Sequence, residues 1–119
     1  MGAIRSFRDL IVWQKSMDMA ELVYELTKQF PRAEVFGLTA QMRKAVVAVP
    51  SNSAEGQQRN TCGEFRQFLG ISAGSLAELE TQSELARRLK YLPQQQWERL
   101  NAMTAEVGKL LNGLMRSLQ

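Results

Sequence analysis

The side chains most able to do chemistry in this sequence are carboxylates and basic groups, because the chain has no histidine and a single cysteine, Cys62. Glu78, Glu80 and Glu84 lie close together on a predicted helix and invite comparison with a metal site. Helical di-iron sites, however, pair glutamate with histidine, and structural zinc sites are built from cysteine and histidine. We therefore interpret these carboxylates as a solvated helix face and predict neither a metal nor a cofactor.

The sequence also offers no nucleophile with a matching base for nucleophilic catalysis. A serine nucleophile needs a neighbouring base, and the absence of histidine removes the commonest one. No lysine is paired with a serine in a pattern that would mark a buried base. We expect no catalytic residues and a protein that is not an enzyme.

The basic residues are the next candidates for function. Fifteen lysines and arginines against twelve acidic residues leave a formal charge of +3 and a pI near 9.4. This balance permits contact with nucleic-acid phosphates without requiring it. The residues that we expect to make such contacts are Lys15, Arg43, Lys44, Arg59 and Arg66. Their alternative role is ordinary solvation or pairing between subunits.

The segment Val49–Gly56 is the most distinctive stretch, because a polar run continues a predicted helix directly after Pro50. Asn52 and Glu55 fall on one helical face. We predict that they form a structural polar network, bonding either the backbone groups freed by Pro50 or a neighbouring helix. A ligand-binding role is the alternative.

Four amphipathic patterns must position these groups. The first runs from Leu10 to Phe30, with Asp9 placed to cap its start and Pro31 to stop it. The second runs from Leu38 towards Arg59 and should kink near Pro50, or divide there into two shorter helices on one axis. A strand over Ala45–Val49 is the alternative, but it would have no partner strand.

A capping-box signature, Thr61 with Glu64, predicts the start of a third helix that continues to about Leu89. Pro93 ends that region, and a fourth apolar row runs from Trp97 to Leu118. Gly70 and Gly74 form a G-x-x-x-G spacing, which should let two helices approach closely. Short connections make each helix antiparallel to the one before it. The sequence thus predicts an all-α, antiparallel, up-down-up-down four-helix bundle, kinked in its second helix, as a single domain over residues 1–119.

The chain shows no sign of membrane insertion or secretion. Its longest uncharged apolar run, Ala45–Pro50, is far shorter than the roughly 20 residues of a membrane span. Met1–Leu10 lacks the apolar core of a signal peptide. We expect a cytoplasmic protein with no membrane partner.

The apolar rows exceed what one bundle can bury. The first helix offers Trp13, Met17, Ala20 and Tyr24 on one row, with further apolar residues on adjoining rows. The third carries Ile71 off its main row. One stripe about 100° wide is enough for a helix in an isolated bundle. We therefore predict a homo-oligomer that buries parts of helices 1 to 3.

Five blocks of sequence, in order, resemble a known family. They are Phe7–Lys15, Phe36–Ala45, Val49–Gly56, Glu64–Leu69 and Gly74–Gln82. With these spacings the chain resembles the bacterial four-helix-bundle proteins encoded within intervening sequences of 23S ribosomal RNA genes. That family also includes the accessory proteins of diversity-generating retroelements.

The resemblance implies a cytoplasmic bundle assembled as a ring of five subunits with a basic surface. The retroelement members associate with a reverse transcriptase and bind nucleic acid. For this chain it implies a nonenzymatic partner of RNA or DNA, or alternatively a protein-interaction scaffold, for example for a reverse transcriptase. Gly63 and Ala73 stand where the resemblance would lead us to expect basic residues, which thins the positive charge.

Overall fold

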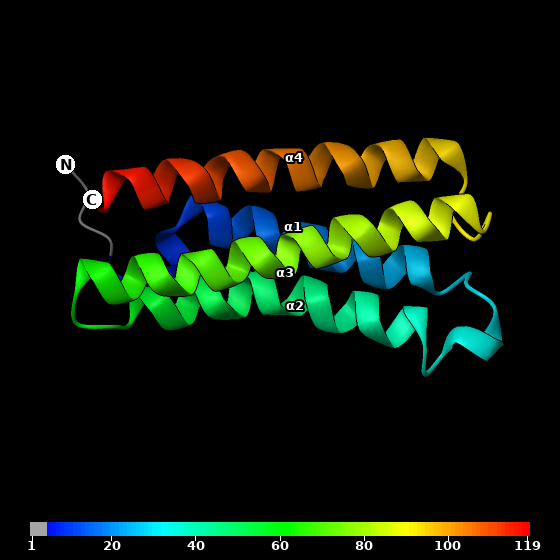
Figure 1. Ribbon diagram of the computed structural model, residues 1–119, viewed down its shortest axis with the longest axis horizontal. Helices are drawn as coiled ribbons and strands as arrows, with labels where there is room; N and C mark the ends of the chain where they lie inside the picture. Colours follow the sequence, from blue (N-terminus) through cyan, green and yellow to red (C-terminus); the bar gives the residue numbers. More distant parts are fainter. Residues whose placement is uncertain (1–4) are drawn as a thin grey trace.

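The computed structural model describes residues 5–119, and these residues form four long helices (Figure 1). The helices are α1, Ile11–Thr27; α2, Leu38–Gln57; α3, Cys62–Arg88; and α4, Gln94–Ser117. Two short 3-10 helices, η1 over Phe7–Asp9 and η2 over Arg32–Glu34, precede α1 and α2. Residues 1–4 of the N-terminal segment considered above for a signal peptide lie outside the described residues. None of the helices within 5–119 combines the length and hydropathy of a membrane span.

The all-α prediction is confirmed, and no strand occurs within residues 5–119. Successive helices run in opposite directions along the long axis, so the start of α1, the end of α4 and the α2–α3 turn share one end of the molecule (Figure 1). We call this the terminal end. The core lies along the middle of the bundle, where every helix contributes fully buried side chains. Among the largest are Met19, Val23, Met42, Val46, Leu69, Leu79, Leu100, Val107 and Leu111.

The start of α1 differs from the prediction. Asp9 does not cap this helix, because Leu10 holds the N-cap position and supplies no side-chain hydrogen bond. Asp9 closes a capping box in η1 instead, where its carboxylate accepts the backbone N–H of Ser6 at 3.2 Å. The Thr61 cap of α3 is confirmed, since its hydroxyl accepts the N–H of Glu64 at 3.1 Å. Of the two predicted caps, Thr61 caps α3 as its signature suggested, and Asp9 takes part in the cap of η1 rather than of α1.

The end of α1 is also earlier than Phe30. The helix closes at Thr27, and the N–H groups of Lys28, Gln29 and Phe30 then bond carbonyls three residues back. Such bonds tighten a last turn ahead of a proline, here Pro31. Phe30 nevertheless packs in the core at 7% exposure. Phe30 therefore fitted the apolar pattern because it is buried in the core, and not because it belongs to the helix.

Helix α2 continues through Pro50 as one element, so it does not divide into two helices. Ala45–Val49 is helical, and the strand alternative is wrong. The kink at Pro50 stays a prediction. The helix ends at Gln57, two residues short of Arg59.

Helices α2 and α3 approach each other closely at Gly56. A Cβ atom on Gly56 would lie 2.8 Å from the Cβ of Phe68 and 3.1 Å from the carbonyl oxygen of Phe65. No side chain fits there. The close helix contact predicted at Gly70 and Gly74 is wrong within the protomer, because Cβ atoms on these glycines would meet nothing within 4 Å.

Buried hydroxyls lie between the same two helices. Ser53 of α2 and Ser72 of α3 each donate to the carbonyl of Val49 at 2.9 Å, and their oxygens lie 3.1 Å apart. Both side chains are 0% exposed. Since the pair holds two protons, two of these three contacts are hydrogen bonds at any moment. This cluster fixes the register of α2 against α3.

We predict opposite effects for two glycine-to-alanine substitutions. Gly56→Ala should lower the free energy of unfolding by about 1–3 kcal/mol, because the new methyl group forces α2 and α3 apart. Gly70→Ala, the matched control in an open helical position, should raise it by about 0.5–1 kcal/mol. Urea unfolding at one protein concentration measures both. Equal effects would show that the α2–α3 contact is not close.

Candidate nucleic-acid interface

Two of the five predicted contact residues, Arg59 and Arg66, lie at the terminal end. Arg59 follows α2, stacks over the ring of Phe68 at 4.7 Å, and pairs with Glu55 at 3.4 Å. Arg66, on the second turn of α3, donates to the carbonyl of Leu118 at 2.6 Å. The antiparallel order of the helices brings them together, and each guanidinium keeps donors beyond these contacts.

Two further arginines belong to this end, and the sequence reasoning missed them. Arg116 lies in the last turn of α4, and Arg8 lies in η1, over the Phe7 ring at 4.6 Å. Neither takes part in an ion pair within residues 5–119. The signal that could have found them is the bundle topology, which places the start of helix 1 beside the end of helix 4.

Lys15 and Arg43 are not part of this group and have partners within the bundle. Lys15 faces α4, where its ammonium group lies 3.9 Å from the carboxylate of Glu106. Arg43 is bound to the end of α1: its Nε donates to Thr27 Oγ1 at 2.9 Å, its Nη2 donates to the Tyr24 carbonyl at 3.3 Å, and it stacks on the Tyr24 ring. The backbone N–H of Lys28 bonds Glu25 and not Tyr24, so the Tyr24 carbonyl accepts from side chains instead, from Arg43 and from the Thr27 hydroxyl at 3.3 Å. Arg43 therefore has a structural role.

Lys44 is exposed and lines a polar groove of about 420 Å³ between α2 and α3. Gln41, Ser75, Glu78 and Gln82 line the same groove. The Oε1 atom of Gln82 is buried there with no hydrogen-bond partner among the described residues. Of the five predicted residues, Lys44 is the one whose ammonium group has no hydrogen bond or ion pair within 5–119.

Asn52 and Glu55 bond groups that are close to them in sequence, not a neighbouring helix. The Asn52 amide donates to the carbonyl of Ala48 at 2.9 Å, and Glu55 pairs with Arg59. Pro50 leaves the carbonyl of Val46 without its helical donor, and Asn52 does not bond that group. The expected bridge to a neighbouring helix belongs instead to Ser53 and Ser72, which the sequence reasoning passed over as small polar residues.

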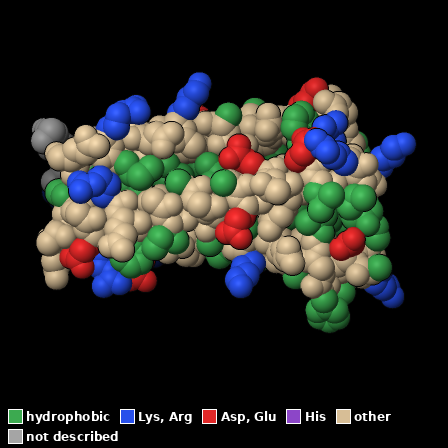
Figure 2. Space-filling view, viewed as in Figure 1, with side chains coloured by type: hydrophobic (Ala, Val, Ile, Leu, Met, Phe, Trp, Pro, Cys, Tyr) green, Lys and Arg blue, Asp and Glu red, His purple; other side chains and the backbone are tan. Residues whose placement is uncertain are grey.

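Basic and acidic side chains interleave on the face shown in Figure 2. Lys and Arg side chains occur along the whole length of this face, and acidic groups lie among them at the ends and in the middle. No single large basic patch covers this face. Contact with phosphates would therefore depend on a local group of basic residues, and the terminal end holds Arg8, Arg59, Arg66 and Arg116.

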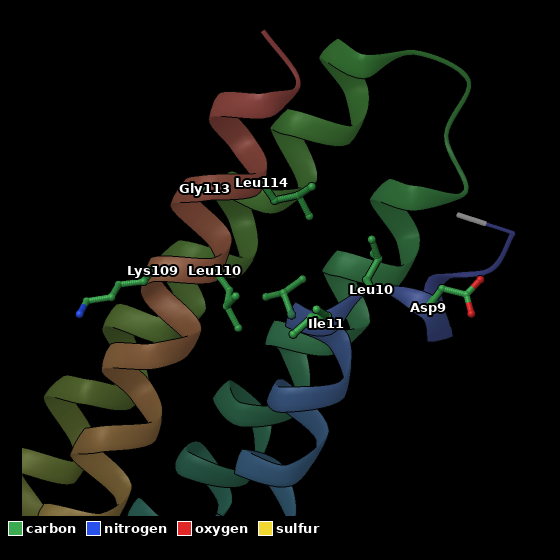
Figure 3. A pocket seen from close by; sticks show the side chains of 8 residues that line it. Asp9, Leu10, Ile11, Lys109, Leu110, Gly113 and Leu114 are labelled. Atoms are coloured by element: carbon green, nitrogen blue, oxygen red, sulfur yellow. The ribbon is translucent and has the colours of Figure 1, made fainter. Parts of the chain in front are cut away.

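An apolar groove of about 390 Å³ lies between the start of α1 and α4 (Figure 3). Leu10, Ile11, Leu110 and Leu114 line it, whereas the charged ends of Asp9 and Lys109 point away from it. No group of three or more potential metal ligands occurs within residues 5–119. The groove offers an apolar surface and no acid–base pair.

The clearest pKa shifts belong to structural carboxylates. Glu34 accepts the backbone N–H of Leu38 at 3.0 Å and the hydroxyl of Tyr91 at 2.9 Å. These bonds, the backbone one first, hold the pKa of Glu34 below its ordinary value. The hydrogen bond to Glu34 raises the pKa of Tyr91. Hydrogen bonds from Arg87 and then Arg88 lower the pKa of Glu84.

Comparison with known proteins gives one family. The model of the family described as 23S rRNA-intervening sequence protein matches residues 8–113. A comparison with the curated proteins gives no match. Among solved structures, a protein of unknown function from the S23 ribosomal protein family of Bacteroides thetaiotaomicron superposes with a TM-score of 0.80. It is 24% identical, with 88% of this chain and 98% of that chain covered, and this likeness shows the fold.

Arg43→Ala should lower the free energy of unfolding by about 1–3 kcal/mol, because it removes two hydrogen bonds and the stacking on Tyr24. Lys44→Ala is the matched control: the same charge is lost from the next residue, and stability should change by less than about 0.5 kcal/mol. Thermal and urea unfolding measure both variants. Equal stability of the two would contradict the structural role of Arg43.

Stability should also fall in acid through Glu34. Because its pKa is lower in the folded chain, the unfolded chain binds more protons near pH 4.3, and the stabilisation is lost as pH falls through the folded pKa. Glu34→Gln should therefore lose less stability than the wild type between pH 5 and pH 3. Glu78→Gln, at an exposed glutamate, serves as the control. An unchanged pH dependence in Glu34→Gln would refute this role.

Proposed function

The chain belongs to the 23S rRNA-intervening sequence protein family, and from that premise we propose that it is a nonenzymatic, cytoplasmic homo-oligomer that contacts RNA or DNA through a basic surface. The observation that carries the proposal is the gathering of Arg59, Arg66, Arg116 and Arg8 at the terminal end. Contacts of this kind recognise phosphates without reading sequence.

The charges at the terminal end suit a phosphate surface. Arg116 and Arg8 have no ion pair within residues 5–119, and the Arg59–Glu55 pair is about half exposed on both sides. Exposed pairs of this kind contribute little, so a phosphate can replace the carboxylate at small cost. Lys44 is a second point of contact in the proposal, while Lys15 and Arg43 have partners within the chain. Asp9, Glu55 and Glu64 at the same end limit the net charge.

The nonenzymatic part of the proposal is supported by the chemistry of the grooves. The groove in Figure 3 is apolar, and in the polar groove beside Lys44 no hydrogen bond among the described residues joins the Ser75 hydroxyl to Lys44 or Glu78. The residues that titrate unusually, Glu34, Tyr91 and Glu84, are explained by structural hydrogen bonds. An active site is expected to combine such shifts with a cleft.

Assembly is supported by apolar side chains that are partly exposed to solvent in the protomer. Met17 and Tyr24 of α1, Val47 of α2 and Ile71 of α3 are each 40–47% exposed. These are the three helices that the sequence analysis predicts to be partly buried in a homo-oligomer. A homo-oligomer would cover part of this surface and bring several terminal ends together, which raises the local density of positive charge. The five-subunit number rests on the family resemblance.

A second candidate function is a protein-interaction scaffold, for example for a reverse transcriptase. It is favoured by the apolar groove between α1 and α4, which has the size and lining of a site for an apolar side chain or helix (Figure 3). In that case contact with nucleic acid would be incidental. The two functions separate cleanly in a binding measurement on the purified protein.

The proposed function predicts salt-dependent binding of nucleic acid. Fluorescence anisotropy with a structured RNA and a DNA duplex should show affinity that falls steeply between low and physiological salt. For the duplex, the slope of log K against log salt should drop by about 0.9 for each phosphate contact removed. The variant Arg59→Ala/Arg116→Ala should weaken binding and reduce this slope.

The matched control removes the same charge from the other end. Lys28→Ala/Arg88→Ala loses two cations that pair with Glu25 and Glu84, and it should keep the wild-type slope. If both double variants lose affinity equally, the terminal end is not the contact surface. If the wild type binds neither nucleic acid at low salt, the proposal fails and the scaffold function is favoured.

A further inference from the structure

The connection between α1 and α2 presents an apolar tip to solvent. Phe36 is 93% exposed, more than any other large hydrophobic residue described, and Val35 beside it is 50% exposed. In Figure 2 hydrophobic side chains project from the molecule over the start of α2. A phenylalanine offers about 150–250 Å² of surface that water disfavours. Such a side chain left open on a monomer needs an explanation.

The tip is held in place. Glu34 bonds the first N–H of α2 at Leu38 and the hydroxyl of Tyr91 in the α3–α4 turn. Gly37 follows Phe36 with φ −107° and ψ −115°, and a Cβ atom there would lie 2.7 Å from the Glu34 carboxylate. The backbone on both sides of Phe36 is therefore fixed. An exposed aromatic on a fixed backbone loses less entropy on binding than one on a mobile loop.

An apolar groove of about 530 Å³ lies between α1 and α2 of the same chain. Trp13, Met17, Tyr24, Val47, Pro50 and Ala54 form most of its lining. Phe36 of the same chain does not occupy it, since that side chain is almost fully exposed. The groove therefore has room for an aromatic side chain from another molecule.

The charges beside the tip and the groove are complementary. Arg32 is exposed on η2, four residues before Phe36, and Glu21 is exposed on α1 at the edge of the groove. Neither joins an ion pair within residues 5–119. Opposite charges at the rim of a contact favour the matching orientation of two partners.

We infer that the partner of this groove is a second copy of the chain, whose Phe36 enters the groove while its Arg32 faces Glu21. This inference rests on the homo-oligomer of the proposed function and adds the contact that builds it. Tip and groove are different surfaces of one protomer, so the contact is heterologous and repeats from subunit to subunit. A contact of this kind closes into a ring when its rotation closes.

Self-association tests the inference. The wild type should exceed 13.5 kDa in multi-angle light scattering at micromolar concentration. Phe36→Ser should weaken self-association by about thirtyfold or more, the loss expected of a buried aromatic anchor worth about 2 kcal/mol. Its circular dichroism should not change, because the side chain contacts little of its own protomer. Leu89→Ser, at an exposed apolar residue just after the end of α3, is the matched control and should keep the wild-type mass.

A charge swap gives the second test. Glu21→Arg alone and Arg32→Glu alone should each weaken self-association by about tenfold, and the double variant should recover most of it. A double variant no better than the singles would overturn the inference. So would a wild-type mass in Phe36→Ser. If the wild type itself is a 13.5 kDa monomer, the homo-oligomer of the proposed function is wrong, which is a different failure.

Discussion

The close approach of α2 and α3 is the constraint on which the rest of this molecule depends. It exists because Gly56 has no side chain to hold Phe65 and Phe68 away. Ser53 and Ser72 then meet at the carbonyl of Val49, and a buried hydroxyl without a partner would cost about 1–3 kcal/mol. The contact permits one register. That register sets where the α1–α2 connection ends and where Arg59 and Arg66 gather.

The positions of the four helices could be predicted from periodicity and from proline and capping residues. Thr61 caps the start of α3 as predicted, whereas Pro93 holds the N-cap position of α4 and α3 ends earlier, at Arg88. The α2–α3 contact could not be predicted in the same way, because Gly56 was one glycine among eight and the sequence did not show which side chains it would meet. Gly70 and Gly74 had the more familiar spacing, yet their positions are open. Only the partner surface decides whether a glycine is needed.

The site was less predictable than the fold. Lys15, Arg43, Lys44, Arg59 and Arg66 were chosen for charge alone, and charge does not reveal whether a side chain already has a partner. Arg43 shows the difficulty most clearly, since its guanidinium serves the end of α1 and the ring of Tyr24. Arg116 was overlooked because its position becomes meaningful only when helix ends meet. Phe36 likewise gave no sign in sequence that it is exposed.

Assembly and nucleic-acid contact are linked in this account, because a protomer with a charge of +3 offers only a modest positive field. The central claim is that the assembled form is the one that binds. Sedimentation velocity of a fluorescent duplex with the protein, followed at the wavelength of the label, tests it most directly. We predict that the duplex sediments with the oligomer at low salt and is released as salt rises. A duplex that sediments freely beside an assembled protein, or with a single 13.5 kDa subunit, would contradict the claim.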